Sequence, residues 1–135
     1  MVIAMKALVL DDDPLVLALL SHLLAFRGYD VASYADPRQC PLSKCGACPC
    51  ALRQAGCPDL ILTDVNMPSM SGVEFVSELK HKGCQCPNIA MISGDWSESN
   101  LALARQLGVE VFSKPCDLPR LDVWARRILG DTPAH

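Results

Sequence analysis

Short apolar runs alternate along the chain with longer stretches of helical periodicity. The runs predict strands at 7–10, 31–34, 59–63, 88–92 and 109–112. Apolar residues three and four positions apart predict helices within 14–27, 73–82, 101–107 and 118–129, each ending before a glycine. Consecutive parallel strands need crossover connections, so this alternation favours an α/β fold, in which helices cover both faces of an open parallel sheet.

The length of 135 residues fits one domain, 1–135, with a single core. Within it we expect a cysteine-rich insert at about 36–58, which replaces or extends the second helix, and a frayed tail at about 130–135. The net charge of -3 offers no basic surface for nucleic acid or anionic membranes. No apolar stretch reaches the roughly 20 residues that cross a bilayer. We therefore expect a cytoplasmic protein without direct nucleic-acid or membrane contact.

Polar residues follow the predicted strands at the edge where the carboxyl ends of parallel strands meet. They are Asp11 and Asp12 after the first strand, Asp64 after the third, Ser93 after the fourth and Lys114 after the fifth. Each alone has an ordinary structural explanation as a cap, a turn residue or a solvated side chain. Together, three carboxylates need a cation such as Mg²⁺, beside which one carboxylate can attack a phosphoryl group. The pattern predicts a phosphoryl-transfer site.

Four stretches contain these polar residues. They are LVLDDDP at 8–14, DLILTDVNMPSMSG at 59–72, MISG at 91–94 and FSKP at 112–115. In order and spacing, over nearly the whole chain, they resemble the receiver domain of two-component response regulators, of the single-domain chemotaxis type. The resemblance implies a flavodoxin-like, doubly wound, five-stranded parallel sheet of order 2-1-3-4-5.

The resemblance also implies roles for the acidic residues and the lysine. Asp64 would accept a phosphoryl group from a histidine of a partner kinase. Asp12, Asp64 and the backbone carbonyl of Asn66 would bind Mg²⁺, and Asp11 would act largely through a metal-bound water. Lys114 would pair with the phosphoryl oxygens.

Further roles concern the residues around these. Ser93 would move toward the new phosphoryl group and carry the following loop with it, and the peptide between Lys114 and Pro115 is expected to be cis. Asn66 and Asp95 occupy positions that tune hydrolysis of the aspartyl phosphate in similar proteins. An acidic Asp95 either orients water or only solvates its loop.

The fifth strand departs from the family pattern. The position three before Lys114, often Tyr or Phe in similar proteins as the partner of the switching hydroxyl, is Val111. Phe112 comes one place later, and we expect it to pack in the core. The spacing from Gly108 to Lys114 is also one residue short, so the usual aromatic reporter of the active state is in question.

Eight cysteines are many for a cytosolic domain, and the resemblance does not explain them. The candidates for a shared site are Cys45, Cys48, Cys50, Cys57, Cys84 and Cys86. The first two have zinc-knuckle spacing, and the last three precede strands three and four, at the amino edge of the sheet. Three interpretations stay open: a Zn²⁺ ion or iron–sulfur cluster, disulfides, or thiols packed as small apolar side chains.

The sequence favours a signalling phosphoacceptor with autophosphorylation and autodephosphorylation chemistry, not an enzyme. Its partners would be a sensor histidine kinase or phosphotransfer protein and a downstream protein target. If the chain is complete, its output is a docking surface made by the last two strands and the last two helices. One alternative is a small phosphatase of the haloacid dehalogenase type, because Asp11 and Asp13 form a D-x-D, although no acidic pair follows Lys114. The other is a cysteine-based metal or redox module on a receiver scaffold.

Overall fold

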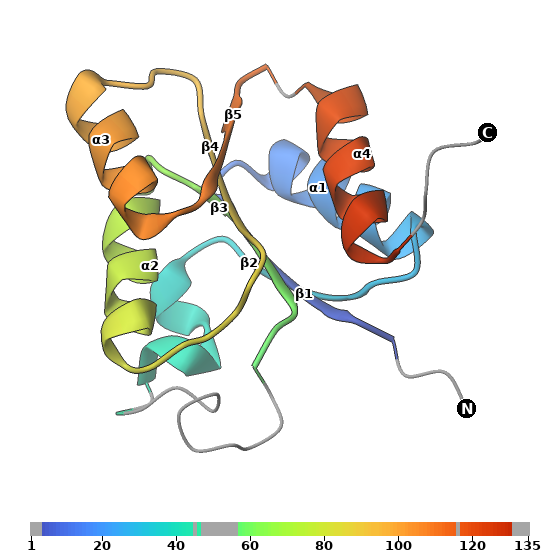
Figure 1. Cartoon of the computed structure of the whole chain (residues 1–135), viewed down its shortest axis with the longest axis horizontal. Coiled ribbons are helices and arrows are strands. Elements are labelled where there is room, and N and C mark those ends of the chain that lie inside the picture. Colours follow the sequence, from blue (N-terminus) through green and yellow to red (C-terminus); the bar gives the residue numbers. More distant parts are fainter. Residues whose placement is uncertain (1–3, 45, 47–56, 116, 131–135) are drawn as a thin grey trace.

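Five parallel strands form one sheet at the centre of the molecule (Figure 1). They are β1 (Lys6–Leu10), β2 (Asp30–Tyr34), β3 (Leu60–Asp64), β4 (Ile89–Ser93) and β5 (Glu110–Ser113). The order across the sheet is β2-β1-β3-β4-β5, as the sequence resemblance implied. This computed structural model describes residues 4–44, 46, 57–115 and 117–130.

Helices cover both faces of the sheet, so the predicted doubly wound arrangement is confirmed. They are α1 (Pro14–Phe26), α2 (Gly72–His81), α3 (Glu98–Leu107) and α4 (Leu118–Ile128). Figure 1 shows α1 and α4 on one side of the sheet and α2 and α3 on the other. The buried side chains accordingly form two clusters, one against α1 and α4 and one against α2 and α3.

Strands β3 and β4 end one residue later than the sequence pattern predicted, and both end on a polar residue. Asp64 pairs with Ile92, and Ser93 pairs with Ser113, so each polar residue still belongs to the parallel ladder. Both side chains are buried. The two polar groups are therefore held by sheet pairing and not by a mobile loop.

Helix α1 begins as predicted, because the carboxylate of Asp13 accepts a hydrogen bond from the Leu15 N–H and caps the first turn. Apolar residues occupy all sides of this helix. Leu20 is buried, whereas Leu15 is 81% exposed and Phe26 is 82% exposed. Among the described residues, no helix is long and apolar enough to cross a membrane.

The described residues between β2 and β3 hold two short 3₁₀ turns, η1 (Pro37–Gln39) and η2 (Pro41–Lys44), where the family pattern has a helix. Cys40 and Leu42 are buried in the same cluster as α2. The ammonium group of Lys82, at the end of α2, donates to two backbone carbonyls of η2. The turns therefore cover part of the face that a helix would cover.

Candidate functional site

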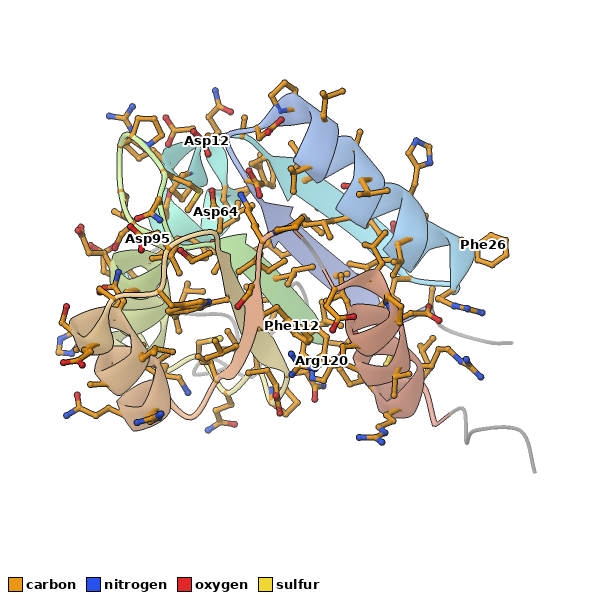
Figure 2. All side chains as sticks on the ribbon, turned by 90° about the horizontal axis from the view of Figure 1, so that it is seen from above. Asp12, Phe26, Asp64, Asp95, Phe112 and Arg120 are labelled. Carbon is orange, nitrogen blue, oxygen red and sulfur yellow. The ribbon has the colours of Figure 1, made fainter. Side chains whose placement is uncertain are left out.

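Three carboxylates meet at the carboxyl edge of the sheet. Asp11 and Asp12 follow β1, and Asp64 ends the neighbouring β3. Each offers an oxygen atom, and these atoms all lie within 4.8 Å of one another. Figure 2 looks onto this edge and labels Asp12 and Asp64 in it. The convergence that the sequence pattern predicted is present.

Lys114 bridges the two buried members of this acidic cluster. Its Nζ lies 3.1 Å from Asp11 Oδ2 and 3.3 Å from Asp64 Oδ2. The remaining oxygens accept backbone hydrogen bonds: Asp11 Oδ1 from the Asp13 N–H, and Asp64 Oδ1 from the Asn66 N–H. Asp11 and Asp64 are therefore held in place from two sides.

Burial and charge set the protonation of this group. Burial, and then the negative charge of Asp11, raise the pKa of Asp64 to about 6, although Lys114 acts in the opposite direction. Burial alone would lower the pKa of Lys114, but its contacts with the two carboxylates outweigh burial and raise it. The lysine therefore stays charged at neutral pH, where most of Asp64 is ionised.

The charges of the cluster suit a divalent cation. Three ionised carboxylates and one ammonium group leave an excess of two negative charges in a partly buried pocket. Asp12 is exposed, so the pocket opens to solvent on its side. Oxygen ligands within this spacing and with this charge fit Mg²⁺.

The hydroxyl of Ser93 lies beside the acidic cluster and is almost fully buried. Its Oγ accepts hydrogen bonds from the side-chain amide of Asn66 and from the Asp95 N–H, both at 3.1 Å. The backbone N–H of Lys114 donates to the Ser93 carbonyl at 2.9 Å. The loops after β3, β4 and β5 are thereby joined at one point.

Two expectations about the fifth strand are confirmed. The peptide between Lys114 and Pro115 is cis. Phe112 is 3% exposed and packs edge-on against Trp124, with ring centroids 5.8 Å apart. Val111 packs against the core on the opposite face of the sheet. Phe112 is therefore a core residue, and no aromatic ring stands at position 111.

Sequence reasoning did not single out Trp96, which lies three residues after Ser93. Its indole N–H donates a hydrogen bond of 2.8 Å to the Phe112 carbonyl, and its ring packs against the core next to α2 and α3. The signal available in the sequence was a large aromatic residue in an otherwise polar loop. Trp96 thus connects the loop that follows Ser93 to β5.

The predicted cysteine site is described only in part. Cys45, Cys48 and Cys50 lie outside the described residues. The Sγ atoms of Cys57 and Cys84 are 3.8 Å apart, at the amino ends of β3 and β4, away from the aspartates. The thiol of Cys86 is buried and donates to the Asn88 carbonyl. A shared cysteine site stays a prediction.

Known proteins resemble this chain along most of its length. The model of the response regulator receiver domain matches residues 7–125. The chemotaxis protein CheY4 of Vibrio cholerae is 29% identical, with a TM-score of 0.73, over 93% of this chain and 99% of that one. A response regulator receiver protein of Pseudomonas putida has a TM-score of 0.76 at 22% identity, over 94% of this chain and 99% of that one, which shows the fold alone.

Transcriptional regulatory proteins match as well. PhoP of Bacillus subtilis, the alkaline phosphatase synthesis transcriptional regulatory protein, is 29% identical over 127 residues, which are 92% of this chain and 48% of PhoP. TcrX of Mycobacterium tuberculosis, a probable transcriptional regulatory protein, is 24% identical over 93% of this chain and 50% of its own length. The chain thus spans about half the length of these relatives. From its fold, its acidic edge and these matches, we conclude that the chain belongs to the response regulator receiver family.

Proposed function

We propose that this receiver domain accepts a phosphoryl group on the carboxylate of Asp64. The observation that carries the proposal is the position of Lys114 Nζ, 3.3 Å from Asp64 Oδ2 and 3.1 Å from Asp11 Oδ2, in a cluster of three carboxylates. An ionised oxygen beside a fixed cation is a nucleophile whose reaction can be stabilised electrostatically.

In the proposed transfer, an oxygen of Asp64 attacks the phosphorus of a phosphohistidine on a partner protein. The new bond joins phosphorus to the Asp64 oxygen, the bond from phosphorus to the imidazole nitrogen breaks, and the imidazole takes a proton from water. Lys114 balances part of the charge on the phosphoryl oxygens, because its ammonium group already lies against Asp64.

Receiver domains bind Mg²⁺ in an acidic pocket, and this one fits that role. We assign Asp12, Asp64 and the Asn66 backbone carbonyl as direct ligands, and Asp11 as a residue that acts through a metal-bound water. When bound, the ion neutralises the phosphoryl oxygens as a Lewis acid. The excess of two negative charges supports this assignment.

Ser93 is proposed as the group that detects the phosphoryl group. Its Oγ already accepts two hydrogen bonds, so its own proton is available for a phosphoryl oxygen. Movement of Ser93 toward Asp64 would pull on the loop that contains Asp95 and Trp96. Asn66 and Asp95 both donate hydrogen bonds to the Ser93 hydroxyl, and we propose that they set the rate at which water hydrolyses the aspartyl phosphate.

The proposed output surface consists of β4, α3, β5 and α4, because the loop from Ser93 to Trp96 connects β4 with α3. The proposed partners are a histidine kinase or phosphotransfer protein and a downstream protein, and the proposed location is the cytoplasm. A haloacid dehalogenase mechanism is not favoured. It needs the second carboxylate of the D-x-D as an acid, but the carboxylate of Asp13 caps α1.

The test is incubation with acetyl phosphate and Mg²⁺, followed by intact mass measurement. We expect one added phosphoryl group in the native chain and none in Asp64→Asn. Asp30→Asn, which changes an exposed carboxylate on β2, is the matched control and should react like the native chain. Phosphorylation of Asp64→Asn, or steady phosphate release that Asp11→Asn abolishes, would contradict the proposal.

A further inference from the structure

Two thiols from segments far apart in the chain meet at the amino edge of the sheet. Cys57 precedes β3 and Cys84 precedes β4, 27 positions later, and their Sγ atoms are 3.8 Å apart. We infer that Cys57 and Cys84 are a site of reversible oxidation, at which a small-molecule disulfide converts the two thiols into one protein disulfide. The inference needs these two side chains alone and is independent of the phosphorylation proposed for Asp64.

The two sulfur atoms are already in contact. Both residues are thiols in this structure, and at 3.8 Å no other group fits between the sulfurs. A disulfide bond holds its sulfurs about 2.05 Å apart, so these two must approach by a further ~1.8 Å. Rotation about the Cα–Cβ bond of each cysteine supplies a movement of this size. Bond formation therefore needs an adjustment of two side chains and no rearrangement of the sheet.

The backbone fixes the distance between the two segments. β3 and β4 are adjacent parallel strands, and neighbouring strands lie about 4.8 Å apart. Ahead of the ladder, the side-chain amide of Asn88 donates to the Asp59 carbonyl at 3.0 Å. The Cys84 N–H donates to the Leu79 carbonyl at 2.9 Å, which ties Cys84 to the end of α2. Disulfides span Cα separations of about 4.4–6.8 Å, a range that includes the spacing of these strands.

Exposure separates this pair from the other described cysteines. Cys40 and Cys86 are 2% and 7% exposed and belong to the core. Cys57 and Cys84 pack at the border of that core and are partly exposed. Oxidation of a thiol follows its exposure, because the oxidant must reach the sulfur atom. Among the cysteines that the structure describes, this pair is therefore the one that a dissolved oxidant attacks first.

The oxidant in this inference is a low-molecular-weight disulfide such as oxidised glutathione. The thiolate of one cysteine attacks a sulfur of the small disulfide, which forms a mixed disulfide and releases one small thiol. The second cysteine then attacks the protein sulfur of the mixed disulfide, and the second small thiol leaves. The protein sulfurs lose two electrons and two protons, and the small disulfide gains both. An excess of the small thiol reverses the reaction.

The bond would link the start of β3 to the start of β4 around α2. A cross-link between residues 27 positions apart removes conformational freedom mainly from the unfolded chain, so it stabilises the fold. The thiol–disulfide balance of the surroundings would thereby set the stability of the receiver domain. In reducing compartments, disulfides are usually transient and redox-sensing, as this one would be.

The experiment equilibrates the full chain in mixtures of reduced and oxidised glutathione and then traps the remaining thiols by alkylation. We expect peptide mapping by mass spectrometry to find a cross-link between Cys57 and Cys84 that dithiothreitol removes. The Tm of the oxidised chain should lie about 5–10 °C above that of the reduced chain. Cys57→Ser and Cys84→Ser should lose the cross-link and most of this Tm shift. The matched control is Cys86→Ala, which removes a buried thiol and should retain both.

Three outcomes would overturn the inference: no cross-link between the two cysteines at any glutathione ratio, disulfides that join either one only to other cysteines, or an unchanged Tm shift in both serine variants. Circular dichroism shows whether these variants fold, and if they do not, alkylation of the native chain decides. Protection of Cys57 and Cys84 at the same glutathione ratio supports the site. Protection of the two at different ratios overturns it.

Discussion

The side-chain amide of Asn66 donates a hydrogen bond of 3.1 Å to the hydroxyl of Ser93, across the gap between the ends of β3 and β4. The Asp95 N–H donates to the same oxygen. The serine hydroxyl is therefore positioned by Asn66, two residues after the proposed acceptor Asp64, and by Asp95 of its own loop. A change at Asp64 has a direct structural connection to the loop that leads into α3.

Ser93 is predicted to couple phosphorylation to the environment of Trp96. The chain has two tryptophans, so a Trp124→Phe background leaves Trp96 as the sole indole reporter. Phosphorylation by acetyl phosphate should change Trp96 fluorescence, because the shift of Ser93 strains the hydrogen bond from Trp96 to the Phe112 carbonyl. In Ser93→Ala the phosphoryl group should still appear by mass, with most of the fluorescence change lost. An equal change with and without the hydroxyl would refute this coupling.

The raised pKa of Asp64 predicts a pH-dependent loss of stability. Its pKa is about 6 in the fold and 3.8 ordinarily, so the native state binds more protons between these values. Stability from this group is thus greatest at low pH and falls as pH rises from about 4 to 6. In metal-free buffer, Asp64→Asn should be more stable than the native chain by about 1–3 kcal/mol at pH 7.5, and nearly equal to it at pH 4.

Urea unfolding at the two pH values measures this difference, with Asp30→Asn as the control that should show none. A stabilisation by Asp64→Asn that is the same at pH 4 and pH 7.5 would mean that burial of the charge is not its cause.

Gly72, the first residue of α2, is predicted to tolerate no side chain. A Cβ atom there would collide with the Asp64 carbonyl oxygen and lie 3.1 Å from Thr63 Oγ1. Because both neighbours belong to β3, they cannot move without disturbing the sheet. Gly72→Ala should cost about 1–3 kcal/mol in urea unfolding. Gly94→Ala is the control, since its Cβ would meet only the Lys114 Cβ at an ordinary 3.6 Å; equal losses in both variants would contradict the steric argument.

Arg27, which caps α1, and Asp122 of α4 form a two-point ion pair, with nitrogen–oxygen distances of 2.6 and 2.7 Å. The Arg27 guanidinium lowers the pKa of Asp122, so this stabilisation is present at neutral pH and is lost as pH falls below the ordinary carboxyl range. Asp122→Ala should lower stability by about 0.5–1 kcal/mol at pH 7, and by less at pH 3. Thermal unfolding at both pH values checks this, and a loss that does not shrink in acid would exclude the ion pair as its source.

The acidic edge of the sheet was predictable from sequence because it depends on strand ends. Asp11 and Lys114 directly follow strands. The carboxyl ends of parallel strands lie at one edge of the sheet, so residues at these positions meet there whichever side chains they have. The exact ends were less predictable. Asp64 and Ser93 are polar, so the apolar pattern stops before them, yet both remain in the ladder.

Features that depend on packing were not predictable in this way. Helix α1 is apolar on all sides, so no pattern distinguishes the 1% exposure of Leu20 from the 81% exposure of Leu15. The hydrogen bond from Trp96 to the Phe112 carbonyl joins segments whose distance the sequence does not encode locally. Only the tertiary structure brings those groups together.

Strands β3 and β4 carry oxygen donors at one end and sulfur at the other. Each strand has five residues, so the two ends are separated by about 16 Å. Hard ions such as Mg²⁺ prefer oxygen over sulfur, so the acidic end of these strands attracts the ion and the thiol end does not. The chemical difference between the two rims thus assigns a hard ion to one end of this small sheet.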